Sequence, residues 1–488
     1  MTGLKEKTIS GMVWSAVERF GYTFIMFLSN LFLARLLSPN DFGLIGMIMI
    51  FIAIASIIVD GGFASALIQK KTVDDKDYST VFHVNMILAV MLYIVLYFAA
   101  PSVAVFYAVP PLSDLLRVLG IILIINALSV AQIAKIKREL NFKYLGIVSI
   151  VSSFVGCCVG VLCAFYSLGV WSLVIQSLTI STMKSAILFI SSPWKPSWVF
   201  SNRALKAQFN FGSMILLSNL VDTVYSNLTP LVVGKFFNTK ILGIYTQART
   251  LENVPNNTLI TIVQQVMYPV FSRLQDNVEK LKEGVRKSMK VLVWINFPLM
   301  ILLIVVAAPL FRLLYTDKWI DAIPLFQIAC IGGMMNCVVQ VNIQILASCG
   351  HGWFFFISRL YRQGVGVLLI FLGLYLHGLY GLMCLGIGLS PYFFWIINVM
   401  YTKKVMDYGF KEQFFDIFPT YCLSILCGLF VYLFSFIYEE KMLLLFSQVI
   451  FYIIFYILFS WLFKLEAFSI CYTELKNYIR KKTQFYFL

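Results

Sequence analysis

The sequence predicts an all-α membrane protein that crosses the bilayer about fourteen times. Of its 488 residues, 60% are hydrophobic and only 12% are charged, and the mean hydropathy is +0.85. A soluble domain of this size does not have such a composition. The apolar residues form runs of about 20 or more, long enough to cross a membrane. We expect helices because a helix satisfies its own backbone hydrogen bonds in lipid.

Taken in chain order, the apolar runs alternate with short connections. We predict spans at residues 12–36, 42–69, 80–108, 112–133, 145–168, 170–190, 209–234, 241–271, 289–316, 321–348, 353–376, 378–401, 415–437 and 442–463. The longest connection, 272–290, alternates acidic and basic residues, which favours an exposed helix on the membrane surface.

Lysine and arginine set the predicted orientation. With the N-terminus inside, 28 of the 38 basic residues fall on inside connections and 6 on outside ones. This asymmetry indicates that both termini are cytoplasmic. The net charge of +15 is then explained by topology and by contact with anionic lipids. Nucleic-acid binding is the weaker interpretation, because no basic domain is present to carry it.

An internal repeat is suggested by two segments 200 residues apart. LFLARLLSPNDFGLIG (31–46) aligns with LVVGKFFNTKILGIYT (231–246), with Arg35 on Lys235 and Gly43 on Gly243. Spans one to six and seven to twelve then correspond in order and orientation. We predict two six-helix lobes in a pseudo-twofold relation, with two extra C-terminal helices. The expected boundaries are 1–207, 208–408 and 409–464, followed by a basic cytoplasmic tail at 465–488.

The predicted eighth span is unusually polar. Arg249, Glu252, Asn253 and Asn256 share one helical face, which lipid would not tolerate. We expect that face to line a hydrated cavity on a transport route. Asp222 of the seventh span lies at a similar depth to Glu252, so a charge cluster near the membrane midplane is predicted there.

A second group of charges falls in the first lobe. Arg19 and Asp60 each lie roughly 10 Å from the inner end of their spans, so Glu18, Arg19 and Asp60 are predicted to meet. Other polar residues within spans either face sugar hydroxyls or hydrogen bond between helices: Asn85, Asn126, Gln132, Gln176, Gln340, Asn342 and Gln344.

Several segments resemble one family of transporters. These are GMVWSAVERFG (11–21), ARLLSPNDFGLIGM (34–47), DGGFASALIQK (60–70) and YPVFSRLQD (268–276). They look like Wzx-type polysaccharide flippases of the MOP superfamily, in the branch of the colanic-acid exporters. The resemblance implies an inner-membrane protein that flips undecaprenyl-pyrophosphate-linked oligosaccharides from the cytoplasmic to the periplasmic leaflet by alternating access. Its products would serve O-antigen (lipopolysaccharide), capsule or exopolysaccharide synthesis.

The resemblance also implies roles for the buried charges. Similar flippases are thought to use cationic residues in their first and eighth helices, where Arg19 and Arg249 fall here. A guanidinium suits a pyrophosphate because its donors form a planar, permanently charged fork. The alternative is that neighbouring carboxylates neutralise each arginine and that the pairs pin helices together. Asp60, Asp222 and Glu252 would either pair with basic residues or bind a coupling ion. Glu18 would balance charge, and Asn253 and Asn256 would line the cavity.

Enzymatic functions are disfavoured. The three histidines are scattered, there is no CxxC pair, and no GxxxxGK[ST] phosphate loop is present. We predict no catalysis, no metal and no cofactor. Energy would come from a coupling ion (H⁺ or Na⁺) or from consumption of the product, and a glycan polymerase is a candidate partner. The main alternative is a MATE-like cation-coupled multidrug antiporter, whose cavity should favour carboxylates and aromatics over arginines. A membrane glycan polymerase or ligase would need a large outside loop.

Overall fold

The computed structural model confirms the all-α class. It describes residues 2–70, 73–192, 194–433, 441–473 and 476, and over these ranges it contains helices and connections without strands. The first helices are α1 (Thr2–Leu36), α2 (Pro39–Asp60), α3 (Phe63–Gln69), α4 (Asp75–Tyr107), α5 (Leu112–Leu119), α6 (Ile122–Ala127), α7 (Val130–Arg138), α8 (Phe142–Phe165), α9 (Trp171–Ser191) and α10 (Asn202–Phe236). They are followed by α11 (Thr239–Ile262), α12 (Tyr268–Leu274), α13 (Val278–Val305), α14 (Ala307–Leu314), α15 (Ala322–Ser348), α16 (Gly352–Met383), α17 (Ser390–Met406), α18 (Phe410–Leu433) and α19 (Lys441–Leu462).

Within the described ranges, nine helices are long and apolar enough to cross a membrane, and a tenth span is formed if α5–α7 count as one bent helix. The fourteen predicted spans fall on helices wherever the chain is described. One apolar stretch, Gly352–Met406, carries two predicted spans, and its backbone leaves the helical conformation at His377 and Gly378, where those spans were divided. The number of crossings stays a prediction. Most of the predicted tail, 474–475 and 477–488, lies outside the described residues, and 466–473 is helical.

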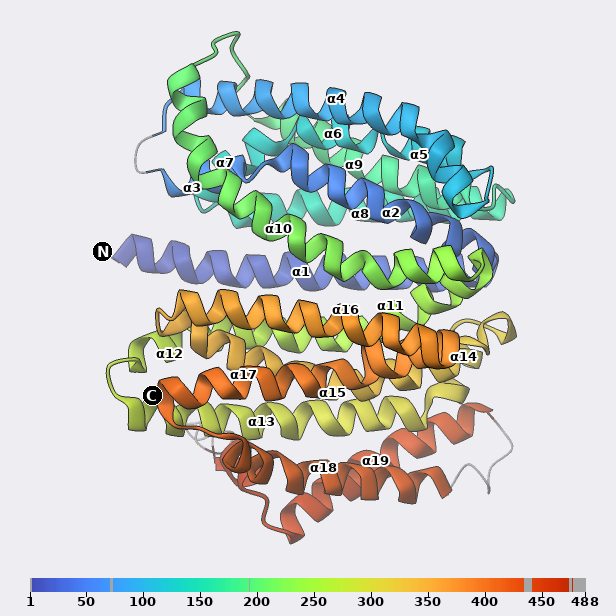
Figure 1. Ribbon diagram of the computed structural model, residues 1–488, viewed down its shortest axis with the longest axis vertical. Coiled ribbons are helices and arrows are strands. Elements are labelled where there is room, and N and C mark those ends of the chain that lie inside the picture. The colour runs from blue at the N-terminus through green and yellow to red at the C-terminus, as the bar shows by residue number, and fades with distance from the viewer. Residues whose placement is uncertain (1, 71–72, 193, 434–440, 474–475, 477–488) are drawn as a thin grey trace, which may run out of the picture. The chain divides into compact units, whose positions relative to one another are not determined.

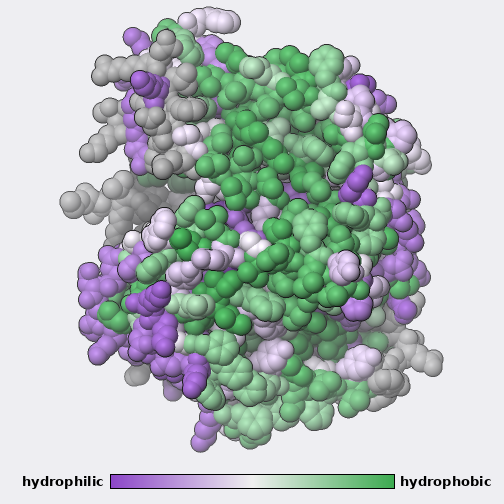
Figure 2. Space-filling view, in the orientation of Figure 1, coloured by the Kyte–Doolittle hydropathy of each residue, from purple (hydrophilic) through white to green (hydrophobic). Residues whose placement is uncertain are grey.

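Hydrophobic side chains cover the middle stretch of the helices on the face drawn in Figure 2, and hydrophilic side chains gather towards the helix ends. Large apolar residues such as Phe98, Val105 and Leu368 are strongly exposed. Such a surface is expected of a protein whose solvent is lipid.

The chain divides into two compact units, Met1–Thr246 and Gln247–Leu488, with the division inside α11. The first unit includes α10, which runs obliquely along it (Figure 1) and packs on α2, α3 and α4. The repeat boundary predicted at 207/208 is a different division, based on span order, and stays a prediction.

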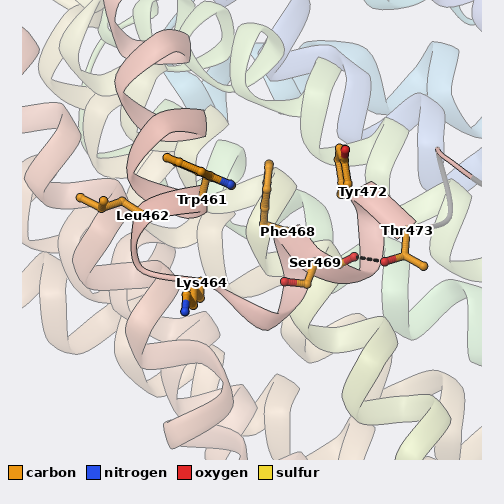
Figure 3. Close-up of a pocket in the computed structure, with 7 residues that line it drawn as sticks. All are labelled: Trp461, Leu462, Lys464, Phe468, Ser469, Tyr472 and Thr473. Carbon is orange, nitrogen blue, oxygen red and sulfur yellow. Dashed lines mark hydrogen bonds between the residues drawn. The ribbon is translucent and has the colours of Figure 1, made fainter.

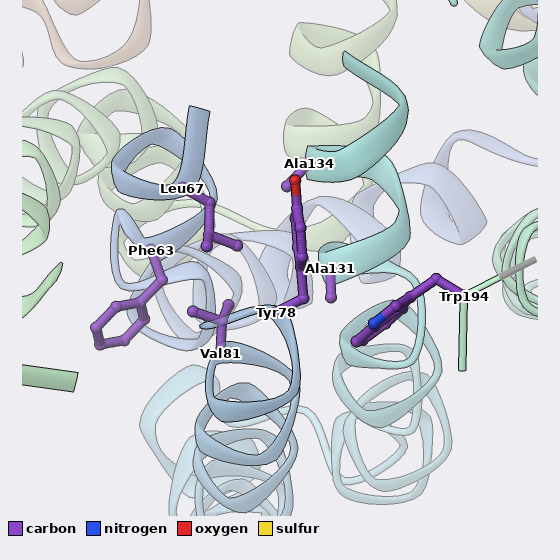
Figure 4. Close-up of a cluster of buried hydrophobic side chains, with 7 residues drawn as sticks. All are labelled: Phe63, Leu67, Tyr78, Val81, Ala131, Ala134 and Trp194. Carbon is purple, nitrogen blue, oxygen red and sulfur yellow. The ribbon is translucent and has the colours of Figure 1, made fainter. Parts of the chain in front are cut away.

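The core of the first unit is built from several apolar clusters. The cluster drawn in Figure 4 joins α3, α4, α7 and a residue after α9: Phe63, Leu67, Tyr78, Val81, Ala131, Ala134 and Trp194. A second cluster joins α2, α4 and α6: Ala55, Val59, Ala89, Leu123 and Ala127. Spacings of three and four residues place each set on one face of its helix. Alanine on α6 and α7 allows these short helices to approach α4 closely.

The two segments that align in the sequence meet inside the first unit. A methyl group on Gly43 of α2 would overlap the carbonyl oxygen of Thr239, and one on Gly243 of α11 would overlap the carbonyl oxygen of Pro39. The Thr239 hydroxyl also donates to the Asn40 side-chain oxygen at 3.0 Å. The contact is reciprocal, because Gly43 and Gly243, like Pro39 and Thr239, are equivalent positions of the alignment. This is the pattern that a twofold relation between the segments would give.

In the second unit, the prediction that residues 272–290 form an exposed helix on the membrane surface is wrong. Helix α13 begins at Val278 and continues without interruption into the ninth predicted span. Leu281, Val285 and Met289 are buried, one helical turn apart, so this part of α13 packs against protein. Its alternating charges were interpreted as solvent contacts, whereas several of them bind α18.

A charged network joins α13 to α18. The Asp416 carboxylate accepts two hydrogen bonds from Arg286 at 2.8 Å and one from the Tyr408 hydroxyl at 2.8 Å, and the Lys290 ammonium lies 3.1 Å away. Burial, and the negative charge of Asp416, raise the pKa of Tyr408 far above its ordinary value. Tyr408 therefore stays a neutral donor at any relevant pH.

We expect Asp416→Asn to lower the free energy of unfolding by about 2 kcal/mol, less than for a fully buried pair because the Arg286 side chain is 41% exposed. Thermal unfolding in detergent measures it. The matched control is Lys287→Ala, which removes an exposed pair with Glu283 on the same helix and should change stability by less than about 0.5 kcal/mol. Equal effects of the two substitutions would contradict a structural role for the network.

Candidate functional site

The polar face of α11 carries an ion pair. An Arg249 guanidinium nitrogen donates to the Glu252 carboxylate at 2.7 Å, and the Asn256 side-chain nitrogen donates to the other carboxylate oxygen at 2.9 Å. The pair connects residues three apart on one helix, as the spacing predicts. Neighbouring Asn253 is partly buried. The structure therefore brings Arg249, Glu252 and Asn256 together.

Glu252 is fully buried, whereas the Arg249 side chain is 25% exposed. The carboxylate packs against α15 at Gly333, where a methyl group would come within 2.7 Å of a carboxylate oxygen. Because the ion pair lies within one helix, it does not itself hold two helices together. It neutralises Glu252 and fixes the orientation of a guanidinium that still reaches the protein surface.

The predicted meeting of Glu18, Arg19 and Asp60 is not observed, since no hydrogen bond or ion pair joins these three residues. Glu18 instead accepts a hydrogen bond from the Ser149 hydroxyl of α8 at 2.8 Å. The Arg19 side chain is exposed, and among the described residues no carboxylate lies within ion-pair distance of it. The sequence gives the position of each residue along its helix but not the rotation of the helix, and the rotation decides which side chains meet.

Asp60 ends α2 and is partly buried. Lys137 of α7 interacts electrostatically with the Asp60 carboxylate, and no hydrogen bond or ion pair joins these two residues. Asp222, predicted to join Arg249 and Glu252, belongs to α10 in the first unit. The three residues predicted to form one charge cluster therefore belong to different units, Asp222 to the first and Arg249 and Glu252 to the second.

Sequence reasoning missed Lys184 of α9. Its ammonium lies within electrostatic range of Glu18 and Lys137, and in the described part of the chain it makes no ion pair. A lysine in the interior of an apolar span, without an acidic residue one turn away, is the signal that would have identified it.

The buried amides differ in their partners. Gln176 donates to Ser29 of α1 at 2.9 Å, and Asn342 exchanges hydrogen bonds with Gln413 of α18 at 3.0 and 3.1 Å. For these two, hydrogen bonding between helices is the correct interpretation. Asn85 and Gln132 have no hydrogen-bond partner among the residues that the structure describes.

Within the described residues, surface pockets lie near the C-terminal helices, and two of them are lined by aromatic and basic side chains. The larger, of about 620 Å³, follows α19 and is lined by Trp461, Leu462, Lys464, Phe468, Ser469, Tyr472 and Thr473. Figure 3 shows that aromatic side chains form much of its wall. The second pocket, of about 490 Å³, includes Lys403, Lys411 and Glu412. Aromatic residues with lysine are typical of a membrane interface, and neither pocket contains a predicted site residue.

Solved structures with the same fold define the class of this protein. The lipid II flippase MurJ in its inward closed conformation matches with a TM-score of 0.75 at 16% identity, covering 95% of this chain and 99% of MurJ. An inward-facing multidrug resistance MATE family transporter of the MOP superfamily matches with a TM-score of 0.62 at 15% identity, covering 81% of this chain and 99% of the transporter. The protein thus has the polytopic helical fold of MurJ and the MATE transporters.

Sequence relatives identify the family. TuaB, a teichuronic acid biosynthesis protein of Bacillus subtilis (strain 168), is 26% identical over 72% of this chain and 73% of its own length. WzxC, a lipopolysaccharide biosynthesis protein of Escherichia coli (strain K12), is 26% identical over 69% and 68%. ExoT, a succinoglycan biosynthesis transport protein of Rhizobium meliloti (strain 1021), is 24% identical over 71% and 70%. The family model described as "Polysaccharide biosynthesis protein" matches residues 32–324. The chain belongs to this family, which confirms the resemblance found in its motifs.

Proposed function

We propose that this multi-pass membrane protein flips lipid-linked oligosaccharides across a bacterial inner membrane, and that it is a transporter rather than an enzyme. The observation that carries the proposal is a match to the polysaccharide-biosynthesis family over residues 32–324 in a chain with the fold of flippases and transporters. Relatives named for teichuronic acid, lipopolysaccharide and succinoglycan biosynthesis support a glycan cargo. The carrier we propose is undecaprenyl pyrophosphate, and the direction is from the cytoplasmic to the periplasmic leaflet.

Two arginines supply the chemistry for the pyrophosphate. Arg19 is exposed, and within the described part of the chain no carboxylate lies within ion-pair distance of its guanidinium. Arg249 is held by Glu252, and a quarter of its side chain stays exposed. A guanidinium binds phosphate oxygens through paired charged hydrogen bonds, and we propose that each arginine contacts the pyrophosphate during transport.

The fold also supports a second candidate, a cation-coupled multidrug antiporter, because a MATE transporter matches with a TM-score of 0.62. The positive charge of an exposed arginine repels a cationic drug and attracts a pyrophosphate, so Arg19 favours the anionic cargo. The lysine and arginine asymmetry supports cytoplasmic termini. We also propose that an ion gradient drives transport and that the protein assembles with a glycan polymerase.

The test is restoration of surface glycan in a bacterium that lacks its own flippase. We expect the wild-type chain to restore it, Arg19→Ala to lower the yield on the order of tenfold, and Arg19→Lys to fall between them, because one lost charged hydrogen bond corresponds to about 1.5–3 kcal/mol. The yield of surface polysaccharide per cell is measured at equal protein expression.

Arg117→Ala is the matched control. Arg117 pairs with Asp114 at 3.8 Å and lies over the Tyr97 ring, and its loss should leave the glycan unchanged. If the wild-type chain instead exports dyes and restores no glycan in strains that make teichuronic-acid-, lipopolysaccharide- or succinoglycan-type polymers, the antiporter is the correct function.

A further inference from the structure

The larger of the two pockets near the C-terminal helices forms where α19 ends and the short helix 466–473 begins. Lys464 joins these two helices with a φ of 50°, in the left-handed region. Its backbone N–H donates to the carbonyl of Trp461 at 3.1 Å, and the N–H of Leu465 donates to that of Ser460 at 3.0 Å. These bonds close the end of α19 and turn the chain. Residues on both sides of the turn therefore line one pocket.

The pocket has an apolar side and a polar side. In Figure 3 three aromatic rings lie along one side, those of Trp461, Phe468 and Tyr472, whereas Lys464 and two hydroxyl groups lie along the other. The side chains of Trp461 and Leu462 are 63% and 58% exposed at the end of an apolar span, so the apolar side continues into the surface that faces lipid. The volume of about 620 Å³ is typical of a site for a small ligand, about 300–1,000 Å³.

The polar side of the pocket is positively charged. In the part of the chain that the structure describes, no carboxylate lies within ion-pair distance of the exposed Lys464 ammonium. The nearest acidic residue in the sequence, Glu466, pairs with Lys290 of α13. The sequence beyond Thr473 adds one acidic and four basic residues: Glu474, Lys476, Arg480, Lys481 and Lys482. The charge therefore favours an anionic ligand and disfavours the basic end of the chain as the occupant.

The two hydroxyl groups of the pocket have already used their protons. Thr473 donates to the carbonyl oxygen of Ser469 at 2.7 Å, and Ser469 donates to that of Leu465 at 3.4 Å. Each hydroxyl oxygen keeps lone pairs, so it can accept a further hydrogen bond but has none to donate. The pocket thus suits a ligand that offers an anion to Lys464 and hydroxyl donors to Ser469 and Thr473. A phosphoglycerol headgroup supplies both, whereas Lys464 would repel the ammonium of phosphatidylethanolamine.

Phe468 connects the pocket to α13. The centroid of its ring lies 6.0 Å from that of Trp294, which in turn lies 5.8 Å from the ring of Tyr456 on α19. The Trp294 indole also donates to the Ser460 hydroxyl at 3.1 Å. The ion pair of Lys290 with the short helix lies one turn away on α13. A ligand in the pocket therefore touches the same ring that packs the helix 466–473 on α13.

We propose that this pocket binds one molecule of an anionic phospholipid, phosphatidylglycerol, from the leaflet that the end of α19 reaches. The phosphate lies at Lys464, the glycerol hydroxyls donate to Ser469 and Thr473, and the acyl chains follow the exposed side of α19 from Trp461. The bound lipid adds contacts to Phe468 and thereby holds the helix 466–473 on α13. In the predicted orientation this leaflet is cytoplasmic. Occupancy does not depend on the proposed cargo, because no pocket residue is a proposed ligand of the pyrophosphate.

The test is hydrogen–deuterium exchange of the full chain in phosphatidylcholine vesicles, with and without added phosphatidylglycerol. The added lipid should slow amide exchange in residues 465–473 on the order of tenfold, because it stabilises the closed helix. Lys464→Gly removes the ammonium but suits the left-handed backbone, so α19 should end as before and the slowing should be lost. Thr473→Val keeps the side-chain shape but removes an acceptor. It should reduce the slowing by phosphatidylglycerol to that produced by phosphatidic acid, which lacks the glycerol hydroxyls.

Lys287→Ala is the matched control. It lowers the net charge by the same amount and removes an exposed lysine that pairs with Glu283 outside the pocket, so the slowing should persist. Wild-type exchange that does not respond to phosphatidylglycerol, or an unchanged response in Lys464→Gly, overturns the proposal. An equal loss in Lys287→Ala also overturns it, because general surface charge then attracts the lipid. Equal slowing by soluble glycerol 3-phosphate would assign the pocket to a soluble anion instead of a lipid.

Discussion

Arg249→Met is expected to lower the free energy of unfolding by about 3 kcal/mol and to abolish glycan transport. The substitution leaves a fully buried Glu252 carboxylate without its counter-ion, and breaking a buried pair from one side costs about 3–5 kcal/mol. We use the lower value because the arginine side chain is 25% exposed. Thermal unfolding in detergent and the yield of surface glycan measure the two effects separately.

The double variant Arg249→Met/Glu252→Gln separates the two roles of Arg249. The amide that replaces the carboxylate is neutral and can still bond Asn256, so most of the lost stability should return. Transport should stay abolished, because the phosphate contact is still missing. Arg249→Lys keeps the charge but not the planar fork and should transport partially. A stable double variant with wild-type transport would show that Arg249 is only a counter-ion.

Gly43→Ala and Gly243→Ala should each destabilise the first unit by about 3 kcal/mol, at the upper end of the range for overpacking. In both, the added methyl group meets a backbone carbonyl, which cannot rotate away as a side chain can. The two segments must separate, and we expect transport to be lost at normal expression. Thermal unfolding gives the magnitude.

The double variant Gly43→Ala/Gly243→Ala tests whether the two glycine contacts form one unit, because both lie in the same interface between the segments. Once one methyl group has separated the segments, the second should cost little, so the combined loss should fall well short of the sum. Gly364→Ala is the control, because Gly364 of α16 has open space around its Cα and alanine should stabilise the helix by about 0.5–1 kcal/mol. Additive losses at Gly43 and Gly243 would mean that the contact does not act as one unit.

The sequence predicted features that depend on neighbouring residues of one helix, or on the requirement that the chain be apolar in lipid. Composition predicts the helical class, and the three-residue spacing of Arg249 and Glu252 predicts their ion pair. The break at His377 and Gly378 falls where two spans were divided. The family followed from short motifs such as DGGFASALIQK, and the family match confirms it.

The errors have one physical cause, because a sequence gives depth along a helix but not the rotation of the helix. Glu18 was assigned to Arg19 and Asp60, but it faces Ser149 of α8. The charges of α13 were assigned to water, but Arg286 binds Asp416, 130 residues further along the chain. Asn85 and Gln132 were recognised as polar, but only the packing of the described residues shows that these two amides find no hydrogen-bond partner there.

The membership of α10 in the first unit has a consequence for biosynthesis. The ribosome delivers the first nine helices before α10, so Gly62 has no Gly212 to pack against until synthesis is well past residue 212. The contact between Gly43 and Thr239 forms later still, because Thr239 is synthesised after Gly212. The N-terminal part of the nascent chain therefore enters the membrane incomplete, and its maturation depends on a segment that the translocon inserts later.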